Sequence, residues 1–103
     1  MPPIPPPTAG TAKATTFIDN ERVIVTEWRF APGANTGCHR HGHDYVVVPL
    51  GDGKLRLVHP GGATSEAELK HGVPYYRQAG VEHDVINANP FEFAFIEIEM
   101  KKA

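Results

Sequence analysis

The chain has 103 residues and a formal net charge of −2, with ten Lys and Arg residues against twelve Asp and Glu residues. This length fits one domain. No basic patch or stripe is present, which argues against nucleic acid and anionic membrane surfaces as partners. No apolar run is long enough to cross a bilayer, no secretory signal opens the chain, and the single cysteine, Cys38, cannot form an internal disulfide. We therefore expect a cytoplasmic protein.

Proline dominates the start of the chain, since five of the first seven residues are proline. Proline forbids helix and favours the extended polyproline II conformation. We predict that residues 1–12 form a flexible or semi-extended arm and that residues 13–103 form a single domain. An arm that lies across a neighbouring subunit is the more ordinary interpretation, and a proline-rich ligand for a partner's aromatic groove is the alternative.

The rest of the chain is divided by turn residues at intervals of about ten residues, and no segment has a sustained apolar period of 3.6 residues. The segments between the turns are rich in β-branched and aromatic residues, which is typical of strands. Residues 65–72 have the composition of a helical turn, but their short length and neighbouring glycines favour a strand and loop. We expect strands at 13–19, 21–30, 45–50, 54–59, 73–77, 84–88 and 91–100. This pattern predicts an all-β sandwich or barrel of two packed sheets.

The last predicted strand, residues 91–100, is apolar on both faces. One face carries Phe91, Phe93 and Phe95, and the other carries Ala94, Ile96, Ile98 and Met100. In a chain of this size, such a strand is expected to pack inside the sandwich on one side and against a partner on the other. We therefore expect a homodimer.

A histidine-rich stretch, GANTGCHRHGH, runs from Gly33 to His43. On an extended strand, His39, His41 and His43 would project to the same side, because side chains alternate between faces. Neutral imidazole is a good ligand for iron, zinc, nickel or manganese, so a divalent metal ion explains this convergence. An exposed histidine-rich loop that binds nothing is the alternative on this stretch alone.

Taken with a second stretch, residues 72–87, this sequence resembles the cupin superfamily. Gly33, His39 and His41 fit the opening of the first cupin motif, G-x5-H-x-H, at the usual spacing. Gly72, Gly80, His83 and Asn87 fit the second motif, with Gln78 in place of its proline. The resemblance covers about residues 20–100. It implies a double-stranded β-helix barrel of two antiparallel sheets, with His39, His41 and His83 as metal ligands.

The sequence departs from the cupin pattern at the glutamate that usually completes the metal site. Its place falls on Tyr45 or, with the longer spacing, on Val46, and neither is a carboxylate. We expect a three-histidine site with open positions, to which Asp44 or His43 is a candidate fourth ligand. Asp44 would face away from His41 on a regular strand and could reach the ion only through a bulge. Alternatively, Asp44 could hold a histidine tautomer by accepting its free N–H.

Other side chains are candidates for the mouth of the barrel. Tyr45 and Arg77 are the residues expected to orient a substrate. We expect Cys38 to be a buried, small apolar residue and not a nucleophile, and Trp28 and Phe30 to lie in the core or a dimer interface. The full set of polar candidates is Tyr45, Arg56, Tyr75, Tyr76, Arg77 and Gln78.

The resemblance suggests several functions for this protein, each of which involves a small-molecule ligand. The first is a three-histidine iron dioxygenase, by analogy with cupins that act on thiols and diketones, here with a small carboxylate, thiol or diketone substrate. The second is a non-enzymatic metal- or small-molecule-binding module, because the sequence has no evident acid–base pair beside the histidines. A sugar isomerase or epimerase is the third. The sequence is also similar to small cupins associated with β-alanine degradation, which hints at the metabolism of small amino or carboxylic acids.

Overall fold

The computed structural model describes residues 10–101, and within this range the chain forms nine strands and no helix. The strands are β1 (Lys13–Asp19), β2 (Val23–Phe30), β3 (His39–Arg40), β4 (Asp44–Pro49), β5 (Gly53–Val58), β6 (Thr64–Leu69), β7 (Tyr75–Arg77), β8 (Glu82–Asn87) and β9 (Phe93–Met100). All strand pairs between these elements are antiparallel. The all-β prediction is confirmed, including the strand expected within residues 65–72.

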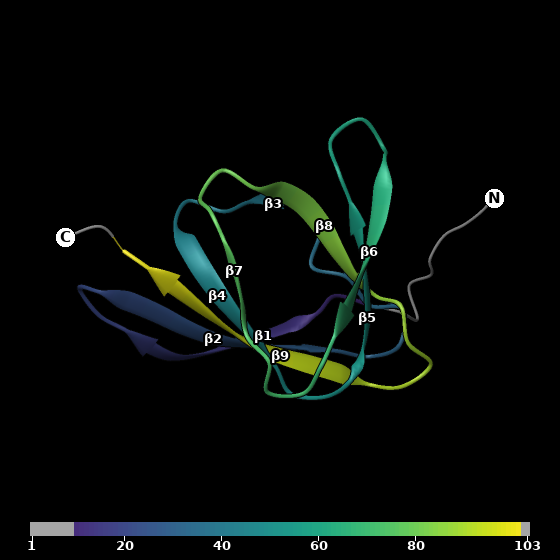
Figure 1. The fold of residues 1–103 in the computed structure, drawn as a ribbon, viewed down its shortest axis with the longest axis horizontal. Coiled ribbons are helices and arrows are strands. Elements are labelled where there is room, and N and C mark those ends of the chain that lie inside the picture. The colour runs from purple at the N-terminus through teal and green to yellow at the C-terminus, as the bar shows by residue number, and fades with distance from the viewer. Residues whose placement is uncertain (1–9, 102–103) are drawn as a thin grey trace.

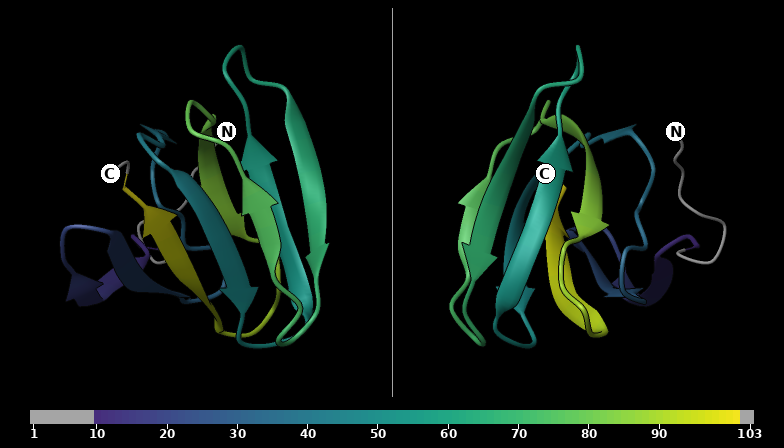
Figure 2. Two further views of the ribbon diagram at one scale, coloured as in Figure 1. Left: turned by 60° about the vertical axis from the view of Figure 1, so that its left-hand side comes forward. Right: turned by 90° about the vertical axis from the view of Figure 1, so that its right-hand side faces the viewer.

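The strands form two sheets, one ordered β1-β2-β9-β4-β7 and the other β3-β8-β5-β6. They face each other as the two layers of a barrel-like sandwich (Figures 1 and 2). Strands distant in sequence are neighbours, since β9 lies between β2 and β4 and β8 lies between β3 and β5. This arrangement brings the two motif segments of the sequence into one sheet.

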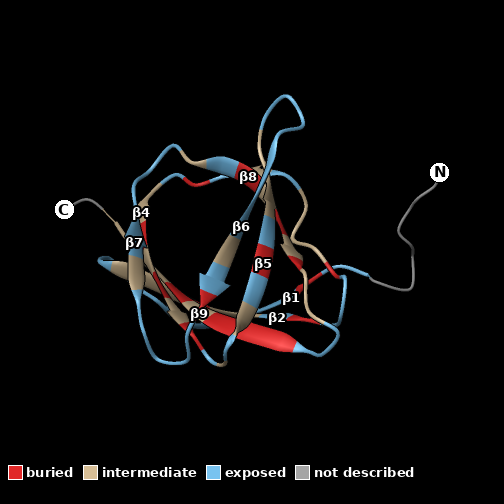
Figure 3. Cartoon of the chain, turned by 45° about the vertical axis from the view of Figure 1, so that its right-hand side comes forward, coloured by how far each residue is buried: buried red, intermediate tan, exposed pale blue. Residues whose placement is uncertain are grey.

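Alternation along the strands decides which side chains fill the space between the sheets. On β4, Tyr45 and Val47 are buried, and on β9 Phe93 and Phe95 are buried (Figure 3). Phe30 contributes from β2, with its ring centroid 5.6 Å from that of Phe95. The interior is therefore aromatic and aliphatic at one end, which leaves the polar side chains of the other end to form a site.

The predicted start of the last strand is wrong by two residues, because β9 begins at Phe93 and Phe91 is 48% exposed. The amide group of Asn87, which is 1% exposed, donates hydrogen bonds to the carbonyl oxygens of Phe30, Ala31 and Phe91 at 3.2, 3.2 and 2.8 Å. The carbonyl of Phe91 is thus engaged by a side chain and not by a strand ladder. The motif asparagine acts as a structural bridge between two loops.

Two further expectations need correction or restriction. Cys38 is exposed and not buried, because it lies in the loop before β3 and outside any strand. The predicted arm mostly falls on residues 1–9, which lie outside the described residues. Thr11 forms a bridge with Asn35, and Ala12 is buried in the core. Among the described residues, none belongs to a helix with the length and apolar character that a bilayer span requires.

Candidate metal centre

Three histidines meet at the polar end of the barrel. His39 on β3 pairs directly with His83 on β8, so the register of these two strands places both rings side by side. His41 follows β3 and is held by its backbone, since its N–H donates to the Val81 carbonyl at 2.9 Å and its carbonyl accepts from the Gly80 N–H at 2.8 Å. The regular strand ends at Arg40, so local pairing with the loop before β8, and not strand alternation alone, directs His41 inward.

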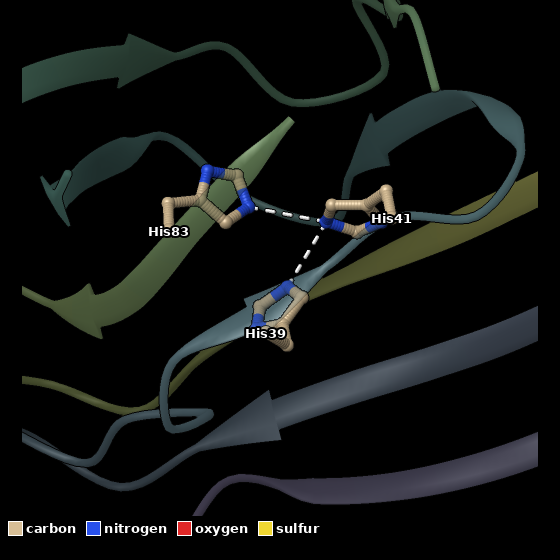
Figure 4. Close-up of side chains that lie close together, drawn as sticks. All are labelled: His39, His41 and His83. Atoms are coloured by element: carbon tan, nitrogen blue, oxygen red, sulfur yellow. Dashed lines mark hydrogen bonds between the residues drawn. The ribbon is translucent and has the colours of Figure 1, made fainter. Parts of the chain in front are cut away.

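The imidazole rings converge through their Nε2 atoms (Figure 4). His41 Nε2 lies 2.9 Å from His39 Nε2 and 3.1 Å from His83 Nε2. The ring centroids are 4.6 to 5.1 Å apart. The ring of Tyr45 stacks on His41 at 4.0 Å and supports it from β4. Three ring nitrogens at such separations require a shared proton or a cation between them.

Burial favours the neutral form of two of these histidines. His41 and His83 are 6% and 7% exposed. The pKa of His41 is lowered to about 4, first by burial and then by the nearby His39 and His83. Burial also lowers the pKa of His83 to about 4, with further lowering by His39, His59 and Arg77 and an opposing effect of Asp84. Both side chains are therefore neutral at pH 7, which is the form that binds metal.

The donor set and its geometry fit a divalent metal ion. His39, His41 and His83 form a group whose candidate ligand atoms lie within 4.8 Å of one another. Two nitrogens bound at right angles to one ion by bonds of about 2.1 Å lie about 3.0 Å apart, whereas a tetrahedral pair lies about 3.4 Å apart. The observed separations of 2.9 and 3.1 Å match the right-angle arrangement. The three histidines could thus hold an ion and leave further positions open.

A small cavity of about 30 Å³ adjoins the histidines. One water-sized group occupies roughly 10–15 Å³ on this measure, so the cavity holds two or three such groups. Tyr45, Tyr75 and Arg77 line it, and the Arg77 guanidinium lies 4.7 Å from the centre of the Tyr75 ring. The opposite wall is apolar, with contributions from Leu55 and Val85. The site therefore suits a very small ligand with a polar end.

The remaining candidates lie elsewhere. Neither Asp44 nor His43 belongs to the three-histidine group. The carboxylate of Asp44 accepts hydrogen bonds from the Tyr76 hydroxyl at 2.8 Å and from the Ala79 N–H at 2.7 Å. Tyr76 is thus turned toward Asp44 and does not line the cavity. Arg56 and Gln78 are exposed and also do not line it, and Arg56 pairs with Glu66 at 3.6 Å.

The sequence interpretation missed two acids on β9, Glu97 and Glu99. They form a second group with His41, with candidate ligand atoms within 4.8 Å of one another. Glu97 lines the cavity, is 7% exposed and accepts a hydrogen bond from Trp28 Nε1 at 3.4 Å. Burial and the neighbouring Glu99 raise its pKa to about 7, against a lowering effect of the Trp28 hydrogen bond.

A signal for these acids was present in the sequence. The face of the last strand that carries Phe93 and Phe95 continues to positions 97 and 99, because side chains alternate. An acid on the inner face of a strand predicted to be buried is a candidate site residue. The pairing of β4 with β9, which sets Glu99 opposite Tyr45, explains how the carboxylates reach the site from the neighbouring strand.

Comparison with known proteins agrees with this fold. No protein-family model matches the chain. It is 61% identical over 90 residues to the β-alanine degradation protein BauB of Pseudomonas aeruginosa, covering 87% of this chain and 94% of that protein. A cupin domain from Bordetella pertussis superposes with a TM-score of 0.87 at 55% identity, covering 90% of this chain and 96% of the other.

A more distant structure shows the same fold. An RmlC-like cupin from Methanocaldococcus jannaschii, with a double-stranded β-helix, superposes with a TM-score of 0.72 at 16% identity, covering 87% of this chain and 80% of the other. The fold and the histidine cluster thus define a cupin, as the sequence resemblance predicted. Within that class, the chain belongs to the family of the β-alanine degradation protein BauB.

The first prediction concerns the ligands. His83→Ala removes one of three nitrogens, and we expect the affinity for Co²⁺ to fall by more than about a hundredfold, because loss of an outer partner alone costs roughly 10–100-fold. His71→Ala, at an exposed turn, is the matched control and should bind as the wild type does. Spectroscopic titration with Co²⁺ measures both, and equal affinities would contradict the site.

The second prediction concerns the pH dependence of stability without metal. Because the pKa values of His41 and His83 are lowered in the folded protein, their contribution to the free energy of unfolding is present above pH 6.5 and is lost as the pH falls toward 4. The raised pKa of Glu97 acts in the opposite direction, because its contribution is present below pH 4.5 and lost as the pH rises through about 7. Over this range, unfolding lets two histidines take up protons while Glu97 releases only one. Urea unfolding in EDTA should therefore show a free energy of unfolding that falls from pH 6.5 to 4.5.

Glu97→Gln removes the opposing contribution, so the stability of this variant should fall more steeply over the same pH range. Glu66→Gln, on the exposed face of β6, serves as the control and should keep the wild-type slope. A wild-type protein whose stability rises as the pH falls over this range would show that the histidines are not buried as neutral groups.

Proposed function

We propose that this chain is a metal-dependent oxidoreductase that acts on a small amino or carboxylic acid with dioxygen. The observation that carries the proposal is the convergence of three histidine Nε2 atoms beside a cavity bordered by Arg77. When bound, an iron(II) ion would supply a redox-active centre with free coordination positions. Imidazole is also a good ligand for manganese, nickel and zinc, and iron is proposed because the activity needs a redox-active ion.

Arg77 is the group proposed to bind the substrate carboxylate. Its guanidinium lies against the Tyr75 ring, and one nitrogen donates to the Tyr76 carbonyl at 3.0 Å, which restrains the side chain at the cavity rim. A guanidinium presents several further donors to a carboxylate. Tyr45, stacked on His41, supports that ligand and borders the same space.

Glu97 is proposed to hold or release a proton at its carboxylate within the cavity. A pKa of about 7 places the group between its two protonation states at neutral pH, which is the range a general acid or base needs. Lack of an acid–base group was the reason to consider a purely binding function. The presence of Glu97 in the cavity therefore favours an enzyme over a binding module.

The size of the cavity supports a small substrate. Space for two or three water-sized groups beside the histidines fits the reactive end of a short acid. The relative named for β-alanine degradation points to the same class of substrate. We propose that substrates of this family are short acids that enter past Arg77.

The chain is also proposed to be a homodimer, with the outer face of the five-stranded sheet against the same face of a second copy. Val25, Ile98 and Val46 form one row across β2, β9 and β4, and Ile18 continues it on β1, where it is 46% exposed. A two-fold axis through this row would set the apolar strip against itself, as an isologous interface requires.

The activity is tested with iron-loaded protein and a panel of short carboxylic acids, amino acids including β-alanine, thiols and β-dicarbonyls. We expect dioxygen uptake with at least one acid. Arg77→Gln should raise KM roughly ten- to a hundredfold, since a charge-assisted hydrogen bond contributes about 1.5–3 kcal/mol. Arg56→Gln, on the exposed face of β5, is the control. Thermal shifts with acids but no uptake would instead support a binding module.

The dimer is tested by sedimentation of the wild type and Ile98→Glu at micromolar concentration. We expect the wild type to sediment as a dimer and the variant as a monomer, because the new carboxylate would be buried in the apolar interface. Thr64→Glu, at an exposed position of β6, should stay dimeric. A monomeric wild type would overturn this assignment.

A further inference from the structure

We propose that Asp84 is a positioning residue for the metal centre, which acts through the loop of residues 35–37 to fix the ring orientation and tautomer of His39. The proposal rests on the proposed three-histidine metal site. The sequence interpretation considered Asp44 as a direct acceptor of a histidine N–H, whereas Asp84 acts on His39 indirectly, through Gly37.

The tautomer of His39 follows from the two neighbours of its Nδ1 atom. The Gly37 carbonyl oxygen lies 2.9 Å from Nδ1, and Thr36 Oγ1 lies 3.2 Å from it. A carbonyl oxygen can only accept, so Nδ1 must carry a hydrogen. The Thr36 hydroxyl donates its own hydrogen to the Gly37 carbonyl at 2.9 Å, and it therefore also faces Nδ1 as an acceptor.

With Nδ1 protonated, a neutral His39 has its lone pair on Nε2. That atom lies 2.9 Å from His41 Nε2, at the point where the three rings converge. Both partners of Nδ1 thus select the tautomer in which Nε2 can bind a metal ion. The ability of His39 to bind a metal ion through Nε2 therefore depends on the orientation of the Gly37 carbonyl.

Asp84 holds the loop that presents this carbonyl. Its Oδ1 atom accepts a hydrogen bond from the Gly37 N–H at 3.0 Å. The Asn35 amide group donates to the same carboxylate at 3.2 and 3.0 Å. Gly37 has a φ of 86°, in the left-handed region that glycine adopts readily, so the carboxylate secures a sharp turn directly before His39.

The loop is also tied to the backbone of β8. The Thr36 N–H donates to the Val85 carbonyl at 3.0 Å, and the Val85 N–H donates to Thr36 Oγ1 at 3.2 Å. Successive side chains of a strand point to opposite faces, so His83 points into the barrel while Asp84 points to the loop. One strand therefore supplies a ligand on its inner face and, through Asp84, positions a second ligand from outside.

An amide reproduces only part of this arrangement, because its one oxygen can accept from the Gly37 N–H while its nitrogen cannot accept from the Asn35 amide. In Asp84→Asn, one oxygen is replaced by an amide nitrogen, which faces the Asn35 amide as a second donor and loses that hydrogen bond. The shape of the side chain is nevertheless retained. We expect the affinity for Co²⁺ to fall roughly 10–100-fold, the range for loss of an outer partner of a metal-bound histidine.

The test combines metal affinity with a direct measurement of the tautomer. Two-dimensional ¹⁵N–¹H spectra of the metal-free protein at pH 8.5 should show His39 protonated at Nδ1 in the wild type and a mixture of tautomers in Asp84→Asn. Co²⁺ titration should show the loss of affinity in this variant, while Asp52→Asn, whose carboxylate binds the exposed His71 N–H at 2.8 Å, should resemble the wild type.

Several results would overturn the proposal. One is a wild-type His39 protonated at Nε2, which needs no variant to observe. Another is an Asp84→Asn protein that binds Co²⁺ within threefold of the wild type, or that keeps the Nδ1–H tautomer while affinity and urea stability fall together. Failure of the wild type to bind Co²⁺ at all would instead contradict the metal site, and the tautomer measurement would still decide the role of Asp84.

Discussion

Three ring nitrogens at separations of 2.9 and 3.1 Å inside a protein set the central constraint on this molecule. Ring nitrogens this close are joined either by an N–H···N hydrogen bond between neutral rings or by a shared metal ion, and burial of His41 and His83 opposes an added positive charge on those two rings. The barrel therefore brings neutral ring nitrogens together at one point, and the neutral form is the one that binds a metal ion. The three histidines could therefore hold a metal ion together.

The architecture meets the constraint by using both faces of its strands. On β8, His83 faces the interior, and Asp84 faces the loop that carries Gly37 and His39. On β9, the inner face begins with Phe93 and Phe95 and ends with Glu97 and Glu99. Because side chains alternate along each strand, the same strands supply an apolar base for the barrel and a polar rim.

The chemistry proposed for the site comes from the contrast between these two regions. Arg77 lies exposed at the rim, whereas Glu97 is buried, and burial raises the pKa of Glu97 to about 7. In this proposal, a short acid places its carboxylate at Arg77 and its reactive atoms near the histidines. The small volume of about 30 Å³ makes this a site for the end of a molecule and limits the substrates that fit.

Much of this could be predicted from the sequence, because it depends on local patterns. Alternation of apolar residues and regular turns indicated the strands and the all-β class, and the spacing around His39, His41 and His83 indicated the cupin barrel and its histidines. These signals reside in residues close together in the chain, or in motifs whose spacing reflects a repeated architecture. The two-sided apolar character of the last strand was visible for the same reason.

Tertiary structure decided which of the candidate acids reach the site. Asp44, the carboxylate nearest to His41 in sequence, accepts hydrogen bonds from Tyr76 and Ala79, whereas Glu97 and Glu99 reach His41 from a strand more than fifty residues away in the chain. Strand order and register determine such neighbours, and neither can be read from one segment. Sequence therefore determined the ligand type and the barrel, and the pairing of β4 with β9 and of β3 with β8 determined the surroundings of the ligands.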